Sequence, residues 1–556
     1  MILPATILFL ILGSLFVWLV GHWRPLWARW LALAVLAINL VALLWLWAHV
    51  DLQPLLQNSS AGNWLIEFKV PWIPQLGIYF HLALDGLSLI MIILTSFLGI
   101  IAVGASWNEI QERVGFFHAM LLWSIAAITG VFLAADLFLF YFFWELMLVP
   151  LYFMIGIWGH ERREYAAQKF FIYTQFAGLL MLLSILGLYF VHGHMTGVYT
   201  FEYDQLLGTA MSPTVAFWLM LGFFIAFAVK LPAFPFHTWL PDAHTEAPTA
   251  GSVILAGLVL KVGAYGFLRF LVPLFPIAAL KIAPLAMTLG VIGILYGALL
   301  AFAQTDLKRL VAYTSISHMG FVLLGIFAWN ELALQGVIII LVAHAISTGG
   351  LFVLVGQLYE RTGTRDLRQM GGLWEDIPRM SRVGLTLALA SLGLPGLGNF
   401  IGEFLVLLGA FQTSRILALL ATLGFVFAAV YALWMVQNIF AGPKRETSPS
   451  IPDLHGRELA IMTVMLVIIF GLGVYPQPVL NMSAPTIQDL QEFVNQPYQL
   501  EQPVITSHDQ TPLAFSSEDS AATTREQANL VSFDNTRDTP AKGAGFKQWQ
   551  TVDVHN

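Results

Sequence analysis

Seven ionisable side chains lie within long apolar stretches of the sequence, where charge is costly. They are Asp85, Glu145, Lys230, Lys261, His318, His344 and Glu403. A charged side chain in the middle of a membrane costs roughly 2.5–3.5 kcal/mol, so each one needs a reason. Asp85, like Asp136, is close to the end of its apolar run, and we expect both at the membrane interface. The other six can bind and release protons, and they predict a path for protons or another cation.

Glu145 and Lys230 form the first candidate pair. Glu145 lies in FLFYFFWELMLVPLYF, and Lys230 ends GFFIAFAVK. A nearby cation favours the ionised carboxylate while burial opposes it, so separating the two groups would change the proton affinity of both. Pro232 and Pro235 follow Lys230 and remove helix hydrogen bonds, which a membrane helix tolerates beside a cavity or a hydrated path. The alternatives are a packing anchor for Glu145 and a lysine that reaches the interface for Lys230.

A second interrupted apolar run contains Glu403. The residues that break it are Pro395, Gly396 and Gly398. Corresponding breaks in two halves of a chain are typical of transporters built from structural repeats. The separation of 173 residues between Lys230 and Glu403 recurs between Glu145 and His318, although the two Leu-Pro pairs are 163 residues apart. The sequence therefore predicts a repeat without a strict register.

Lys261, His318 and His344 are candidates for a relay between Lys230 and Glu403. They lie in LAGLVLKVGAYGFLRF, in TSISHMGFV and in LVAHAIS, respectively. Histidine exchanges protons near neutral pH, and hydroxyl groups and water can link the steps. The alternative for each histidine taken singly is a hydrogen-bonded core residue.

The sequence contains little that would predict a cofactor site, a metal site or binding of nucleic acid. His237 and His244 lie in HTWLPDAHTEAP, whose spacing matches no strong zinc pattern. The chain has no cysteine, which excludes disulfides and iron–sulfur clusters held by cysteine. It has no GxGxxG after a strand, no GxxxxGK[ST], no GxSxG and no long basic stretch. We expect no cofactor or metal site, so energy for uphill transport must come from a partner or another gradient.

The elements that must position these residues are membrane helices. Of the 556 residues, 58% are apolar and 11% are charged, against roughly 45–50% and about 25% in soluble domains. Continuous apolar runs, rather than alternation, exclude a porin-type barrel. The first residues have no positive n-region, so we expect a retained helix there and no signal peptide. The predicted helices span about 2–20, 28–48, 82–106, 115–134, 137–158, 168–191, 214–240, 248–271, 283–303, 308–327, 334–357, 382–411, 416–440 and 458–475.

The basic residues predict the orientation of these helices. Sixteen lie in or beside the gaps after odd-numbered helices, and four lie in or beside the gaps after even-numbered ones. By the positive-inside rule, the odd gaps are cytoplasmic and both chain ends lie outside. Residues 476–556 contain four Lys or Arg and ten Asp or Glu and have no spanning run, so we expect most of this tail to be flexible and extramembrane.

Several stretches resemble the antiporter-like membrane subunits of proton-pumping NADH:quinone oxidoreductase (complex I). They include FFWELMLVPLYF, FAVKLPAFPFHTWLPDAHTEAPTAGSV, AFAQTDLKRLVAYTSISHMGFV and SLGLPGLGNFIGEF. The resemblance covers about residues 1–480. It implies an all-α polytopic fold of 14 helices, with two inverted five-helix repeats and discontinuous helices 7 and 12. The expected divisions are helices 1–3 at 1–114, the repeats at 115–272 and 282–440, helix 14 at 441–480 and the polar tail at 481–556.

The resemblance also implies roles for individual residues. Glu145 matches the family's helix 5 glutamate, and Lys230 matches its helix 7 lysine. Glu403 matches a helix 12 site at which the related subunits L and N carry lysine. The residues that match the central hydrophilic axis are Lys261, His318 and His344. Together these six would carry a proton through coupled changes of protonation.

The family picture places redox chemistry in other subunits. FMN, iron–sulfur clusters and quinone are expected there, with L- and N-type subunits and lipids as partners of this chain and no nucleic acid. The implied location is the bacterial inner membrane. An Mrp-type cation/proton antiporter subunit, which shares the family core, is the alternative. A passive membrane scaffold is a third possibility.

Overall fold

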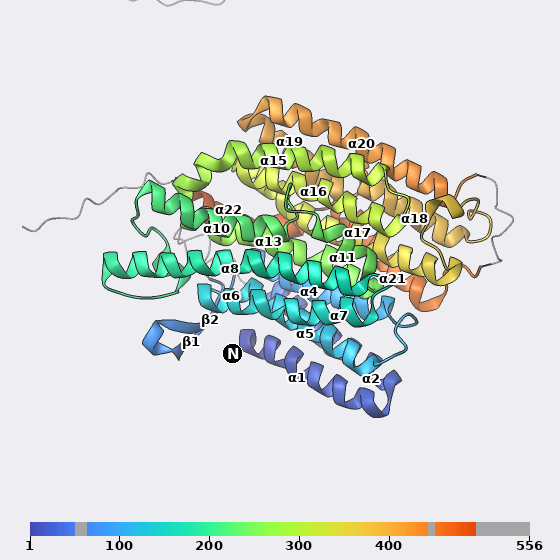
Figure 1. Ribbon diagram of the computed structural model, residues 1–556, viewed down its shortest axis with the longest axis horizontal. Helices are drawn as coiled ribbons and strands as arrows, with labels where there is room; N and C mark the ends of the chain where they lie inside the picture. The colour runs from blue at the N-terminus through green and yellow to red at the C-terminus, as the bar shows by residue number, and fades with distance from the viewer. Residues whose placement is uncertain (51–63, 443–450, 496–556) are drawn as a thin grey trace, which may run out of the picture. The chain divides into compact units, whose positions relative to one another are not determined.

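The computed structural model describes residues 1–50, 64–442 and 451–495. They belong to a unit that spans Met1–Tyr498. Within the described residues, thirteen helices are long and apolar enough to cross a membrane. The remaining predicted span, helix 12, consists of two shorter helices. Figure 1 shows most of these helices side by side, with blue α1 and α2 at one edge of this unit and orange α20 at the opposite edge.

The N-terminal third contains a β-hairpin that the sequence analysis did not predict. Strand β1 pairs antiparallel with β2, and the predicted helix at 82–106 begins only at Gly86. The reason is local: IYFHLAL, residues 78–84, pairs with a neighbouring strand before Asp85 caps the helix. The elements are α1 (Ile2–Trp23), α2 (Pro25–His49), β1 (Ile66–Ile73), η1 (Pro74–Leu76), β2 (Ile78–Leu84), α4 (Gly86–Ala105) and α5 (Val114–Leu133).

The next elements correspond to predicted helices 5 to 8. Helix 5 is divided at Met147, directly after the turn that carries Glu145. Helix 7 is divided between Lys230 and Trp239, which confirms the predicted break. The elements are α6 (Leu137–Leu146), α7 (Leu148–Trp158), α8 (Arg163–Thr196), α9 (Tyr203–Leu206), α10 (Pro213–Lys230), α11 (Trp239–Glu246), α12 (Thr249–Ile254), η2 (Leu255–Val259), α13 (Leu260–Gly266), η3 (Phe267–Leu271) and α14 (Val272–Leu274).

The second half repeats the interrupted-helix design. Helix 12 is divided between Ser391 and Gly398, as the sequence predicted, and Gly393 and Gly396 adopt positive φ angles of 78° and 93° there. Glycine adopts such angles without the steric cost that other residues incur. The elements are α15 (Pro276–Phe302), α16 (Leu307–Ala328), α17 (Glu331–Thr362), η4 (Leu367–Gln369), α18 (Pro378–Ser391), α19 (Gly398–Thr413), α20 (Arg415–Ile439), α21 (Gly456–Val474) and α22 (Gln477–Asn495).

Helix α22 corrects the prediction of a flexible tail from residue 481. Its apolar side chains are buried, among them Met482, Ile487 and Leu490, and the helix packs against α4 and α17. A Cβ at Gly86 would lie 1.7 Å from the carbonyl oxygen of Met482, so the two backbones approach closely. A search for continuous apolar runs does not predict this helix, because its apolar residues recur on one face instead. The rest of the predicted tail, from residue 496, lies outside the described residues.

The most deeply buried helices carry candidate residues. Lys261 lies in the Thr249–Leu274 segment, and His344 lies in α17. The whole apolar window of Thr249–Leu274 is buried, as is that of α17, whereas only about a third is buried in α2 and α20. Two π-helical segments, η2 and η3, flank the α-helical turn that carries Lys261. Such turns leave a backbone carbonyl without its usual helix partner and are frequent at functional sites.

Candidate functional site

Four of the six candidate residues lie together in the interior. Lys261 on α13 contacts His344 on α17, with 2.7 Å between Nζ and Nδ1. His318 on α16 contacts Glu403 on α19, with 2.7 Å between Nδ1 and Oε1. The imidazole rings of the two histidines are 5.3 Å apart, edge to face. Each of the four residues is at most 2% exposed. The structure therefore joins two hydrogen-bonded pairs through adjacent imidazole rings.

Lys261 has a second partner that the local helix geometry provides. Its ammonium donates to the carbonyl oxygen of Ala256 at 2.6 Å. Ala256 belongs to the π-helical segment η2, where the normal helix ladder is altered. A neutral histidine can accept from the ammonium through one ring nitrogen. The two contacts give a buried ammonium two acceptors without a carboxylate and direct one of its N–H groups at Nδ1 of His344.

His318 has partners on the other side of its ring. Its Nε2 lies 3.2 Å from Ser391 Oγ and 3.4 Å from the hydroxyl of Tyr431. Ser391 is the last residue of α18, so the break in helix 12 brings this hydroxyl to the ring. Gly393 lies at the same break, and a Cβ there would be 3.2 Å from Glu403 Oε2. Sequence reasoning had missed Ser391 and Tyr431, because single hydroxyl residues in apolar helices give no distinctive pattern.

Lys230 lies in the interior and Glu145 is half-buried, and the two are not joined in this structure. Lys230 ends α10 and is fully buried, and Glu145 lies in the last turn of α6. No ion pair within 4.0 Å connects these two described residues, and neither Lys230 Nζ nor Glu145 Oε1 has a hydrogen-bond partner there. The groups nearest to the ammonium are aromatic: the ring of Trp144 at 5.2 Å and that of Phe170 at 5.8 Å.

The two aspartates assigned to the interface cap helices. Asp85 accepts from the backbone N–H of Ser88 at 2.8 Å, and Asp136 accepts from those of Phe138 and Leu139. Asp85 also pairs with Arg269, which is close to the end of the predicted helix at 248–271. Arg269 is in fact only 5% exposed. Its guanidinium also contacts the Tyr265 hydroxyl at 3.3 Å, one helical turn from Lys261.

A second group of buried polar residues lies where α11, α12 and α16 meet. The carboxylate of Glu109 accepts from the backbone N–H of Thr249 at 3.0 Å, and Lys308 donates to the carbonyl oxygen of Ala247. Burial raises the pKa of the Glu109 carboxyl group, against the opposing effect of Lys308. His244 stacks on the ring of Phe352 at 4.6 Å. Of these residues only His244 stands out in the sequence, because burial by other helices leaves no mark on the local sequence.

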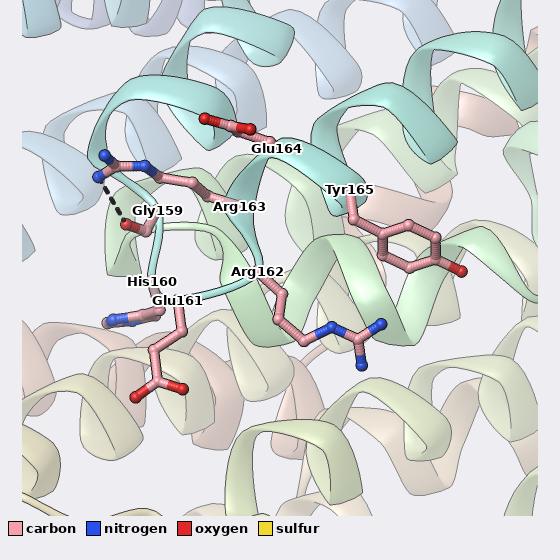
Figure 2. Close-up of a pocket in the computed structure, with 7 residues that line it drawn as sticks. All are labelled: Gly159, His160, Glu161, Arg162, Arg163, Glu164 and Tyr165. Atoms are coloured by element: carbon pink, nitrogen blue, oxygen red, sulfur yellow. Dashed lines mark hydrogen bonds between the residues drawn. The ribbon is translucent and has the colours of Figure 1, made fainter.

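One surface hollow is separate from these buried groups. Figure 2 shows the seven residues that line a cavity of about 660 Å³, namely Gly159, His160, Glu161, Arg162, Arg163, Glu164 and Tyr165. Arg163 turns back onto the loop and donates to the carbonyl oxygen of Gly159 at 3.5 Å. The loop is anchored by Glu246, whose carboxylate accepts from the backbone N–H of Arg162 at 2.9 Å. None of the six candidate residues lines this hollow, which belongs to a loop between helices 5 and 6.

Metal ligands are not gathered at the site. Within the described residues, no group of three or more histidine, aspartate or glutamate side chains is placed to hold a metal ion. His237 and His244, the histidines weighed for zinc, lie apart in their contacts: His237 packs on Phe234 and Tyr296, and His244 packs on Phe352. The arrangement of the buried groups suits proton exchange between side chains.

The chain is similar to several known proteins over most of its length. A family model described as NADH:quinone oxidoreductase/Mrp antiporter, TM, matches residues 134–429. A Pseudomonas aeruginosa protein called NADH-quinone oxidoreductase subunit M is 53% identical over 500 residues, which cover 89% of this chain and 98% of that protein. A chain in the structure of respiratory complex I from Thermus thermophilus with bound NADH is 32% identical, with a TM-score of 0.79, and covers 88% of this chain and 99% of that chain.

This chain also resembles, in its fold, a chain from a second kind of membrane assembly. A chain in the structure of the Mrp complex from Dietzia sp. has a TM-score of 0.76 and 21% identity, and the match covers 90% of this chain and 98% of that one. The two chains therefore share a fold.

Proposed function

From the premise that this chain belongs to the family of antiporter-like membrane subunits of NADH:quinone oxidoreductase, we propose that it works as subunit M of that complex. It is a multi-pass membrane protein that translocates protons, coupled to quinone reduction in other subunits. The match to a subunit M over nearly the full length of both chains supports this assignment. Glutamate at 403, where the L and N types carry lysine, agrees with it.

The observation that carries the mechanism is the buried contact chain across four helices. Lys261 can pass a proton to His344 along a 2.7 Å hydrogen bond, and His318 can pass one to Glu403 along another of the same length. The step between the two imidazole rings requires a ring rotation or a water molecule, since their centroids are 5.3 Å apart. Histidine suits this step because one ring nitrogen can accept a proton while the other releases one.

Lys230 and Glu145 would supply the switch for this chain. When the ammonium and the carboxylate are apart, each loses the partner that favours its charged form. The proton on Lys230 then becomes easier to release toward Lys261. In the structure the second pair, His318 with Glu403, is in contact, whereas Lys230 and Glu145 are not hydrogen-bonded. In the proposed repeats at 115–272 and 282–440, the pair of Lys230 with Glu145 corresponds to the pair of Glu403 with His318. The first pair is then in an open state and the second in a closed one.

The same proposal includes the setting of the chain. Its neighbours are membrane-arm subunits of the L and N types together with lipids, and FMN, iron–sulfur clusters and quinone belong to other subunits. The location is the bacterial inner membrane, with both termini on the periplasmic side. The excess of basic residues after odd-numbered helices supports this orientation.

Mutation of the switch residues tests the function. Lys230→Ala and Glu145→Gln are expected to reduce NADH-driven proton uptake by inverted membrane vesicles more than tenfold, with normal subunit content. The control is Lys281→Ala, which removes an exposed lysine on α15. Normal pumping by both site variants would instead indicate a passive scaffold and overturn the proposal.

The composition of the purified assembly separates the two transport functions. A complex I subunit co-purifies with NADH-oxidising iron–sulfur subunits. An Mrp-type subunit would purify only with small membrane proteins and would support Na⁺/H⁺ exchange without NADH. The fold that this chain shares with the Dietzia chain is the observation that favours this second candidate.

A further inference from the structure

The ammonium of Lys230 is buried without a hydrogen-bond partner among the described residues. The residue is fully buried, and Nζ lies more than 4.0 Å from the Glu145 carboxylate oxygens. An isolated charge in an apolar interior is strongly unfavourable unless something compensates it. A lysine that stays protonated there needs a nearby group that attracts its positive charge.

Two aromatic faces meet that requirement. Nζ of Lys230 lies 5.2 Å from the ring centroid of Trp144 and 5.8 Å from that of Phe170. Both distances are within the range of about 6 Å in which a ring face attracts a cation, and tryptophan is the strongest partner. Trp144 comes from α6, Phe170 from α8 and Lys230 from α10, so three helices build the arrangement.

The two rings are held in place by other aromatic side chains. The ring of Trp144 packs against Phe140 and Phe227 at 5.6 and 5.5 Å. Phe170 packs against Trp239 at 5.4 Å. The indole N–H of Trp239 donates to the carbonyl oxygen of Val229 at 2.8 Å, directly beside Lys230 in the chain. The rings therefore stand at fixed positions around the end of α10.

The carboxylate of Glu145 occupies a separate space that a glycine provides. A Cβ at Gly178 on α8 would lie 2.0 Å from Glu145 Oε1 and 3.6 Å from the indole nitrogen of Trp144. The missing side chain at 178 leaves room for the carboxylate in its present position. Trp144 thus borders both the ammonium and the space that holds the carboxylate.

We propose that Trp144 and Phe170 form an aromatic cage that holds the Lys230 ammonium away from Glu145. The cage residues are positioning residues, and their role rests on the function proposed above. They compensate the charge of the lysine in part while its pair with Glu145 is open, and less than the carboxylate would, so the switch has a second defined position from which the proton is still easier to release. Without the cage, the charged lysine would favour its carboxylate and the pair would stay closed.

A series of substitutions at Trp144 in the assembled complex tests the cage. Trp144→Phe keeps an aromatic face, and Trp144→Leu removes it while keeping an apolar side chain. Phe170→Leu removes the second face. The matched control is Phe142→Leu on the same helix, because Phe142 is 41% exposed and outside the cage. The readout is NADH-driven proton uptake in membrane vesicles, normalised to subunit content.

The cage predicts a distinct order of activities. Trp144→Leu should reduce proton uptake by about threefold to thirtyfold, as expected for loss of a desolvated cation–π contact. Trp144→Phe should retain at least half of the activity, and Phe142→Leu should match the parent. A purely structural role would instead give equal losses for Trp144→Phe and Trp144→Leu, since both leave a cavity, and that result would overturn the cage.

Two further outcomes keep the cage and the proposed function distinguishable. If Lys230→Ala abolishes pumping while Trp144→Leu and Phe170→Leu pump normally, the cage is wrong and the proposed function stands. If Lys230→Ala itself pumps normally, the proposed function is wrong. Should Trp144→Leu fail to assemble, Phe170→Leu decides alone, and normal pumping by that variant would overturn the cage.

Discussion

At the scale of single residues, buried charge is accommodated here in three ways. Arg269 is paired with a carboxylate, that of Asp85. Lys261 is hydrogen-bonded to two neutral acceptors, a carbonyl oxygen and His344. Lys230 lies against ring faces. The first arrangement keeps its charges in place, whereas the second and third allow a proton to leave.

Substitution of His318 can separate its hydrogen bond to Glu403 from its ability to exchange a proton. Asparagine in its place can still donate to Glu403 but cannot take up a proton. His318→Asn should therefore assemble normally and reduce NADH-driven proton uptake by more than about tenfold. The matched control is His118→Asn, because His118 is also buried but bonds only to the carbonyl oxygen of Val114. Unchanged uptake in His318→Asn would remove His318 from the path.

The ion pair of Asp85 with Arg269 should be a stability element. Asp85→Asn leaves the buried guanidinium with less compensation, a change that costs roughly 3–5 kcal/mol when no other partner remains. We expect about 3 kcal/mol, the lower end of that range, because Asp489 on α22 also acts on the Arg269 charge. Thermal dissociation of the purified complex measures the loss. Arg368→Ala, at an exposed pair, should cause no measurable change, and an equal effect of both variants would contradict the prediction.

At the scale of elements, the interruptions in helices 7 and 12 explain how side chains reach the interior path. The break in helix 12 places Ser391 at the end of one helix and Glu403 in the next, on either side of His318. The break in helix 7 ends α10 at Lys230, so the lysine lies at a helix end that is nevertheless buried. Proline and glycine signalled both breaks in the sequence, since they act on the backbone locally.

The left-handed turn at Gly396 should be required for the break in helix 12. Its φ is 93°, and a Cβ there would meet no atom within 4 Å, so any cost of Gly396→Ala is a backbone cost. We expect a loss of about 1–3 kcal/mol in thermal stability, together with reduced proton uptake. Gly471→Ala also enters open space but lies within helix α21, and it should be neutral or slightly stabilising. A neutral Gly396→Ala would show that the turn is not strained.

At the scale of the whole molecule, the orientation in the membrane determines which way protons travel. The absence of cysteine from the sequence makes single introduced thiols clean reporters on this chain. Arg368→Cys lies in a gap predicted to be cytoplasmic, and Val198→Cys lies in one predicted to be periplasmic. Both positions are exposed. In intact spheroplasts, a membrane-impermeant maleimide should label residue 198 and not residue 368, and the opposite pattern would reverse the orientation.

The sequence alone determined the membrane-spanning helices, the breaks in two of them and the six candidate residues. Hydropathy and backbone restrictions act over a few neighbouring residues, so they can be read along the chain. The hairpin β1–β2 escaped because the apolar strand IYFHLAL runs directly into the apolar helix that follows it. Helix α22 escaped because its one-sided apolar face packs against segments that are distant in the sequence.

Only the tertiary structure decided which ionisable groups meet. Lys261 and His344 are 83 residues apart, and His318 and Glu403 are 85 apart, yet each pair is hydrogen-bonded. Lys230, paired with Glu145 from sequence, lies instead against Trp144 and Phe170. Contacts between helices depend on how side chains from separate segments pack. No local sequence pattern encodes that packing. The packing determines the order in which a proton can pass from one side chain to the next.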